Sequence, residues 1–248
     1  MVSRKSNLKE PQETEQKRKP KSAKSKSRRR FWLLIDLAIT LIILALLVYR
    51  PAGYKPTTPA QTDEVNKYWT YYSSQFYNGA QLQKPFELVL TEEGLNQIVA
   101  SSGWPKASEG VSFSKPQVVL EEDEVILMGT AGIGDIQLIV TIVENPSVDE
   151  NGLLNLKITK IKIGAMNITP VAKIIAKQMY AKQMPQLDSD RDDIATKILA
   201  SLLTDEGFEP VFSPPDDKRK KARMERISVE KGKIIIGFVP EGPAKTGR

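Results

Sequence analysis

The sequence predicts an α+β protein in which one N-terminal transmembrane helix precedes an extracytoplasmic domain built on a curved antiparallel sheet packed on helices. Three observations predict this class. A single apolar run follows a basic N-terminal segment. The spacing of apolar residues then changes from a helical to a strand period after about residue 105, and it returns to a helical period after residue 169. An antiparallel sheet with one apolar face needs a cover, which the flanking helices are expected to provide.

The composition excludes most classes of catalytic and metal site, because the 248-residue chain contains no Cys and no His. Without Cys there is no disulfide, thiolate metal site, thiol nucleophile or lipid-bearing cysteine. Without His there is no Ser-His-Asp triad, and the commonest zinc ligand is missing. No pair of carboxylates stands in a context typical of acid–base catalysis. We therefore expect a non-enzymatic protein without a cofactor.

The net charge of +6 is concentrated in residues 1–30, and the chain after residue 50 is net acidic. A nucleic-acid-binding domain is usually basic as a whole, so no nucleic-acid partner is expected. Residues 1–30 are rich in Lys, Ser, Gln, Glu and Pro and are expected to form a disordered cytoplasmic tail. Its last three residues, Arg28, Arg29 and Arg30, are expected to contact anionic lipid.

Residues 31–49 form an apolar run with a single charge, Asp36. As a helix this run spans about 28 Å, enough to cross the hydrocarbon core of a bilayer. The basic residues before it predict a single-pass protein of the cell membrane with its N-terminus in the cytoplasm. A cleavable signal peptide is the alternative, but no A-x-A pattern follows the run. We interpret Asp36 as a tolerated interfacial charge, with a functional intramembrane carboxylate as the alternative.

The composition of the remaining residues predicts a stalk, a folded domain and a short C-terminal tail. Residues 50–62 contain three prolines and are expected to form a semi-rigid stalk. The extracytoplasmic domain is expected over residues 63–240, and residues 241–248 are expected to fray.

The domain is predicted to begin with a helix, a strand and a second helix. Asp63–Tyr77 is expected to be helical because aromatic residues recur on one helical face. Core packing is the simplest interpretation of this stripe, and a lid over an apolar groove or a helix lying against the bilayer surface is the alternative. Phe86–Leu90 is predicted to be a strand. Thr91 is a suitable N-cap for the helix that follows, which Gly103 ends.

Apolar residues then alternate in four consecutive segments, which predicts an antiparallel meander with one apolar face. Pro116 interrupts the first strand, and the polar segment 145–152 is expected to be a loop. In the last strand the alternation changes phase at Thr159–Lys160, as a β-bulge or a sharp bend requires.

Two helices and a hairpin complete the prediction. Thr169–Pro170 marks the start of a helix that Pro185 interrupts. A second helix is expected over residues 189–204, with Gly207 as its stop. A C-terminal hairpin is expected around Lys231–Gly232.

The basic segment Lys218–Lys221 is interpreted as a solvated loop. Contact with anionic phospholipid or with teichoic-acid phosphates is the alternative. An anionic cell-wall polymer is therefore one candidate partner.

Three segments resemble the YpmS-like family of low-GC Gram-positive bacteria. They are FELVLTEEGLNQIVA, VILMGTAGIGDIQLIV and GLLNLKITKIKIGAMNITPVAKIIAKQM. The resemblance implies a basic tail, one membrane span and an extracytoplasmic domain in the cell envelope. The segments are patterns rather than catalytic motifs, so the resemblance assigns no site residues.

Residues 86–204 are also similar, in the order of their expected elements, to bacterial envelope domains related to the TULIP-like lipid-binding fold. This resemblance implies a curved sheet that wraps a helix and leaves an apolar groove for acyl chains. The chain departs from that pattern because it carries one repeat rather than two.

Two functions remain open at this point. The protein is expected to be either a scaffold that holds envelope proteins at the membrane or a lipid-binding module. One form of the lipid-binding module is a TULIP-like carrier of a lipid or of a lipid-linked polymer, and membrane lipid is then the expected partner. The expected groove would be lined by Leu138, Val140, Ile142, Leu156, Ile158, Ile175, Met179 and Ile198.

Overall fold

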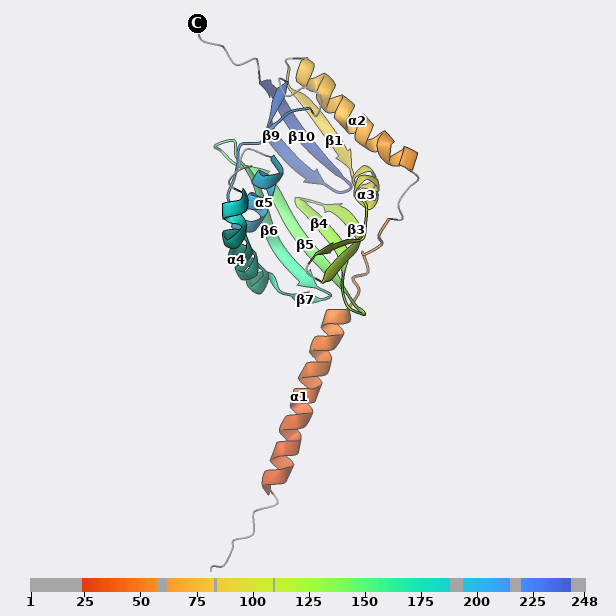
Figure 1. Cartoon of the computed structure of the whole chain (residues 1–248), viewed down its shortest axis with the longest axis vertical. Helices are drawn as coiled ribbons and strands as arrows, with labels where there is room; N and C mark the ends of the chain where they lie inside the picture. The colour runs from red at the N-terminus through yellow and green to blue at the C-terminus, as the bar shows by residue number, and fades with distance from the viewer. Residues whose placement is uncertain are drawn as a thin grey trace, which may run out of the picture. The chain divides into compact units, whose positions relative to one another are not determined.

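The computed structural model confirms the mixed α+β class and describes residues 24–57, 62–82, 84–108, 110–187, 194–214 and 220–241 (Figure 1). The helices are α1 (Lys24–Val48), α2 (Thr62–Gln81), α3 (Glu92–Ala100), α4 (Thr169–Leu187) and α5 (Ile194–Thr204). The strands are β1 (Phe86–Thr91), β2 (Lys106–Ser108), β3 (Val111–Glu121), β4 (Glu124–Ile133), β5 (Ile136–Val148), β6 (Leu154–Ile163), β7 (Met166–Asn167), β8 (Val211–Phe212), β9 (Lys221–Glu230) and β10 (Lys233–Glu241).

Among the described residues, one helical stretch is long and apolar enough to cross a membrane, Arg28–Val48 of α1. A helix of this kind near the N-terminus is compatible with a membrane anchor or a signal sequence. α1 begins at Lys24, so the last part of the predicted disordered tail is helical. Lys, Ser and Arg are compatible with a helix, and extending an existing helix costs less than starting one. Residues 1–23 of that tail lie outside the described residues.

From Ile43 onward the chain forms a second compact unit, whose strands make two antiparallel sheets rather than one. Sheet A has the order β1-β10-β9-β8, and sheet B has the order β2-β3-β4-β5-β6-β7. The predicted meander is confirmed as β3 to β6 of sheet B, and the predicted C-terminal hairpin as β9 and β10. Sheet A was not predicted, because alternation identifies the apolar face of a strand but not its partner.

The main core lies between sheet A, α2 and the adjoining end of sheet B (Figure 1). The rings of Phe76 on α2, Phe86 on β1 and Phe238 on β10 lie with their centroids 5.1 to 5.9 Å apart. Leu120, at the end of β3, is fully buried in the same cluster. The aromatic stripe of α2 therefore contributes to core packing, although Trp69 stays largely exposed.

Two irregularities shape sheet B. Val143 pairs with Lys160 and Glu144 pairs with Ile158, so Thr159 is the extra residue of a β-bulge, as the change of phase predicts. A second register shift between Ser114 and Gln117 interrupts β3 around Pro116. The prediction of a loop from residue 145 was wrong, because β5 continues to Val148 and its backbone pairs with β6.

α4 and α5 lie along an open edge of β6 (Figure 1), whereas the sequence predicted that they cover the sheet face. The Ile161 N–H donates to the Thr169 hydroxyl at 2.8 Å, and the Leu156 N–H donates to the Ser201 hydroxyl at 3.2 Å. The edge of a strand exposes backbone N–H groups that have no partner strand, and these two hydroxyls accept hydrogen bonds from two of them.

The ends of these helices differ from the prediction in two places. α4 starts at Thr169 as expected but continues to Leu187, past Pro185. α5 ends at Thr204, and the residue that follows it, Asp205, adopts the left-handed conformation (φ 61°). The sequence predicted that Gly207 would end the helix. Asp tolerates this region because its short side chain forms local hydrogen bonds. Residues 188–193, the expected start of α5, lie outside the described residues.

Candidate functional site

An apolar cavity of about 360 Å³, here called the α3 pocket, lies on sheet B beside the end of α3. Pairing places Gly129 opposite Val140 and Leu127 opposite Ile142, so these residues share one face of the sheet. The lining residues are Val99, Trp104, Phe113, Ser114, Pro116, Gln117, Val118, Leu127, Met128, Gly129, Thr130, Val140 and Ile142.

Hydrogen bonds from Asn96 fix the wall that α3 provides. Asn96 is buried, and its side chain accepts from the Val118 N–H at 2.8 Å and donates to the Val118 carbonyl at 2.7 Å. The Glu92 carboxylate adds a third link, accepting from the Leu120 N–H at 2.7 Å. At the end of the helix, the Trp104 indole N–H donates to the Val99 carbonyl at 2.7 Å. These bonds attach α3 to β3 and hold the Trp104 ring beside the pocket.

The floor of the pocket is hollow because two features of the strands leave space. Gly129 has no side chain, and a Cβ built there would meet only the Ser114 carbonyl oxygen, at an ordinary contact distance of 3.6 Å. The irregularity of β3 around Pro116 bends that strand at the same level of the sheet. The pocket therefore has room for an apolar group that this chain does not itself supply.

The segment that follows α1 is attached to the same two strands. Tyr54 is buried, and its hydroxyl donates to the Lys115 carbonyl at 2.7 Å and shares a hydrogen bond with the Thr130 hydroxyl at 2.9 Å. The Gln117 side chain bonds the backbone on either side, at Gly53 and Lys55. Part of the predicted stalk is therefore fixed to sheet B. Tyr54 lies six positions after Val48, so the backbone between them reaches at most about 20 Å.

No charged side chain lines the α3 pocket, so it offers no acid, base or cation to a ligand. Two carboxyl groups with shifted pKa values lie elsewhere. Burial raises the pKa of Glu144, and the backbone N–H of Leu153 is the main cause that lowers the pKa of Asp149. Within the described part of the chain, no group of three or more acidic residues could hold a metal ion.

Two of the eight predicted groove residues, Val140 and Ile142, line the α3 pocket. The others are spread over different surroundings: Ile158 is buried, Leu138, Leu156 and Ile198 are half-buried away from the pocket, Ile175 is exposed, and the side chain of Met179 is not among those described. The prediction offered the helices at 91–102, 170–184 and 189–204 as covers of the sheet. It took helical groove residues only from the last two, and it therefore missed the wall made by α3. Trp104, next to Pro105, and Phe113 and Val118, on either side of Pro116, were the available signal.

The basic candidates lie outside this site. Arg28, Arg29 and Arg30 are exposed on α1, at the start of its apolar stretch. Lys218 and the residue after it lie outside the described residues.

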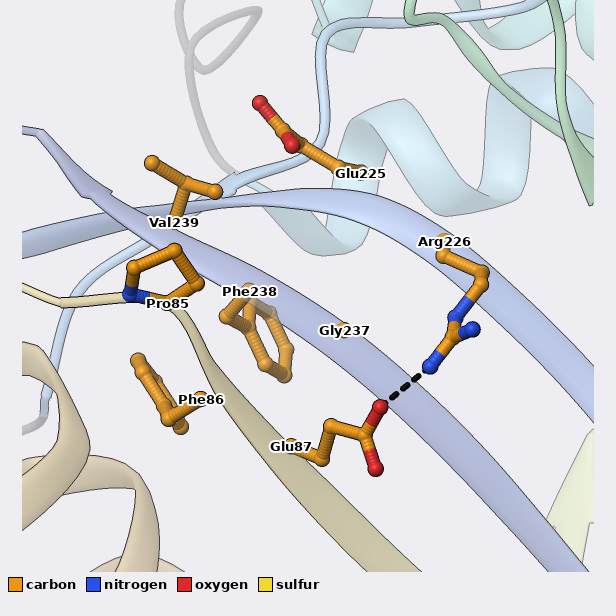
Figure 2. A pocket seen from close by; sticks show the side chains of 8 residues that line it. All are labelled: Pro85, Phe86, Glu87, Glu225, Arg226, Gly237, Phe238 and Val239. Carbon is orange, nitrogen blue, oxygen red and sulfur yellow. Dashed lines mark hydrogen bonds and ion pairs between the residues drawn. The ribbon is translucent and has the colours of Figure 1, made fainter.

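A second hollow, of about 430 Å³, lies on sheet A (Figure 2). Its lining residues are Pro85, Phe86, Glu87, Glu225, Arg226, Gly237, Phe238 and Val239. Figure 2 shows the Arg226 guanidinium directed at the Glu87 carboxylate across β10, and the two form an ion pair. Because each charge already has a partner on an exposed surface, we assign no ligand to this hollow.

No family model, no curated protein and no solved structure matches the chain. The α3 pocket is therefore interpreted from its own geometry.

Proposed function

We propose that this protein is a non-enzymatic, membrane-anchored module of the cell envelope that binds an acyl chain of a lipid in the α3 pocket. The observation that carries the proposal is the apolar lining of a cavity whose wall is fixed by buried hydrogen bonds. The proposal agrees with the resemblances to YpmS-like and TULIP-like proteins, which imply an envelope location and an acyl-chain groove.

The size of the pocket favours part of one chain over a whole lipid. Small-molecule sites usually enclose about 300–1,000 Å³, and about 360 Å³ is at the lower end of that range. Burial of one methylene group contributes about 0.8 kcal/mol, so six methylenes would contribute about 5 kcal/mol before the cost of ordering the chain. Binding of this strength would be reversible.

The attachment of Tyr54 favours a lipid that comes from the membrane crossed by α1. If α1 is an anchor, the sixth residue after its end, Tyr54, is fixed to β4, a strand that lines the pocket. The pocket then stays within about 20 Å of the point where the chain leaves the helix. The basic residues before the span favour a cytoplasmic N-terminus and an extracytoplasmic pocket.

Photolabelling tests the binding of an acyl chain. The full chain is incorporated into nanodiscs that contain a phospholipid with a diazirine on its acyl chain, irradiated, and digested for mass spectrometry. We expect labelled peptides from β3 to β5 in addition to α1. Leu127→Trp should reduce labelling of these strands about tenfold, because the indole fills the pocket, while labelling of α1 is unchanged.

Val89→Trp is the matched control for that substitution. Val89 is 39% exposed and Leu127 is 38% exposed, both lie on strands, and only Leu127 lines the pocket. Equal labelling of the strands in both variants, or no labelling of them in the unmodified chain, would refute acyl-chain binding. The second result would favour the scaffold function.

The absence of Cys makes the topology directly testable. A single cysteine is introduced at Ser6 or at Glu122, and intact cells are treated with a membrane-impermeant maleimide. We expect reaction at position 122 only. Reaction at position 6 only would reverse the proposed orientation, and release of the body into the medium would identify α1 as a cleaved signal sequence.

A further inference from the structure

We propose that one end of sheet B, together with the outward side of α4, docks on the lipid surface of the membrane that α1 crosses. This docking face consists of Ile133, Ile136, Val171, Ile174 and Ile175. The inference rests on the proposed anchoring by α1, and it does not depend on occupation of the α3 pocket.

The docking face is apolar and exposed. Val171, Ile174 and Ile175 follow one another at helical spacing on α4, and each is 51% to 60% exposed. The sequence predicted that α4 packs on the sheet through its larger apolar residues, but the half-buried apolar residues described on α4 are the smaller Ala172 and Ala176. The largest apolar side chains described on this helix therefore point to solvent.

The turn between β4 and β5 adds a second apolar element. Ile133 and Ile136 pair across the turn formed by Gly134 and Asp135, and they are 54% and 60% exposed. Two exposed isoleucines that flank a tight turn form a projecting apolar tip. Such tips are unfavourable in water unless another surface covers them.

One hydrogen bond connects this end of sheet B with the last turn of α1, and this connection points to the membrane as the occupant. In the turn between β6 and β7, the Ala165 N–H donates to the Leu46 carbonyl at 2.8 Å. Gly164 is required there, because its φ is +58° and a Cβ would overlap the same carbonyl oxygen. The Gly164 N–H donates to the Ile139 carbonyl of β5 at 2.7 Å, and α4 begins only four residues after Ala165.

The charges on these elements suit an anionic lipid surface. Lys160 on β6 and Lys177 on α4 are exposed, and Lys162 and Lys173 are half-buried near them in the chain. Lys173 forms an ion pair with Asp205 at 3.1 Å. Among the described residues near the docking face, the other acidic side chains are Asp135, in the β4–β5 turn, and Glu206, after α5. Glu144 lies further along β5, and the acidic segment 188–193 after α4 lies outside the described residues. Exposed apolar residues next to lysines are typical of surfaces that lie in a membrane interface.

Single-cysteine fluorescence on the full chain tests the docking face. The chain has no Cys, so Ile175→Cys, Ile136→Cys and Glu122→Cys each give one site for an environment-sensitive NBD label. Residue 122 lies in the β3–β4 turn, at the opposite end of sheet B from Ile133, and it serves as the control. Each labelled chain is placed, one copy per disc, in nanodiscs with and without phosphatidylglycerol.

We expect a blue-shifted and severalfold brighter emission at positions 175 and 136, with quenching by doxyl lipids, and neither change at position 122. The effect should be larger with phosphatidylglycerol and should weaken in a Lys160→Gln, Lys177→Gln double variant. Emission at both isoleucine positions equal to that at 122 would overturn the inference. A change that requires two chains per disc would also overturn it, because the occupant would be a second copy.

This experiment separates the inference from the proposed function. If α1 is not an anchor, the chain is not retained in the discs and no emission is measured from them. If the chain is retained but the α3 pocket binds no acyl chain, photolabelling of β3 to β5 fails while the fluorescence changes at 175 and 136 remain.

Discussion

The two ends of β4 carry similar apolar side chains in opposite surroundings. Val125, near the start of the strand, is 9% exposed and belongs to the main core with Leu120. Ile133, at its other end, is 54% exposed. The difference arises because sheet A and α2 cover the first end, and no described element covers the second. The alternation of apolar residues shows which face of a strand is apolar. Which part of that face is buried depends on contacts with elements far away in the sequence.

The largest expected effect tests the covered end. Phe238→Ala removes a ring that contacts Phe76, Phe86 and Phe212 and should lower the free energy of unfolding by about 3–5 kcal/mol. Ile136→Ala at the open end should change it by less than about 0.5 kcal/mol. Urea denaturation of the full chain in detergent micelles, followed by aromatic near-ultraviolet circular dichroism, measures both. Similar losses in the two variants would contradict the contrast between the ends.

Asn96→Ala should have the next largest effect, because it leaves the buried N–H and carbonyl of Val118 without their side-chain partner. An unsatisfied buried backbone group costs about 1–3 kcal/mol, so we expect a loss of about 2–3 kcal/mol in the same denaturation measurement. The pocket wall should loosen as well, which hydrogen–deuterium exchange would detect as faster exchange in α3. Asn151→Ala, in an exposed turn, is the control; unchanged exchange in α3 of Asn96→Ala would contradict the role of Asn96.

The sequence predicted the elements better than it predicted their contacts. The meander, the Thr91 cap, the bulge at Thr159 and the hairpin at Lys231–Gly232 all follow from local rules of spacing, capping and turn formation. The pairing of β1 with β10 joins residues far apart in the sequence, and no local pattern encodes it.

The candidate site was predicted only in part, for the same reason. Val140 and Ile142 were identified because alternation places them on one apolar face. Trp104 was missed because the wall that α3 provides depends on Asn96, a polar residue whose partner is the backbone of β3. The predicted position of α4 was wrong because the spacing of apolar residues does not reveal that Thr169 bonds to the edge of a strand.

A smaller effect is expected at the attachment of the segment after α1. Tyr54→Phe removes the hydroxyl that bonds Lys115 and Thr130 but keeps the buried ring, so we expect a loss of about 1–2 kcal/mol. Limited proteolysis in nanodiscs should cut the chain faster next to residue 55. Tyr77→Phe, a tyrosine that is 38% exposed, should leave this cleavage unchanged. Equal cleavage in the unmodified chain and in Tyr54→Phe would show that the hydroxyl does not hold the segment.

The smallest effect concerns Glu144, which lies on β5 opposite Val125, at the covered end of sheet B. Burial raises the pKa of Glu144 above its usual value of 4.5, so the folded chain binds this proton more tightly than the unfolded chain does. The stabilising contribution of the neutral carboxyl is complete below the unfolded pKa and is lost as the pH rises through the raised one. Glu144→Gln stays neutral and should therefore unfold with a higher free energy than the unmodified chain at pH 7, by less than about 1 kcal/mol, and with no such gain at pH 4. Denaturation curves at both pH values measure the difference, with the exposed Glu150→Gln as the control. A gain that is equal at the two pH values would show that packing of the amide, rather than loss of a buried charge, causes it.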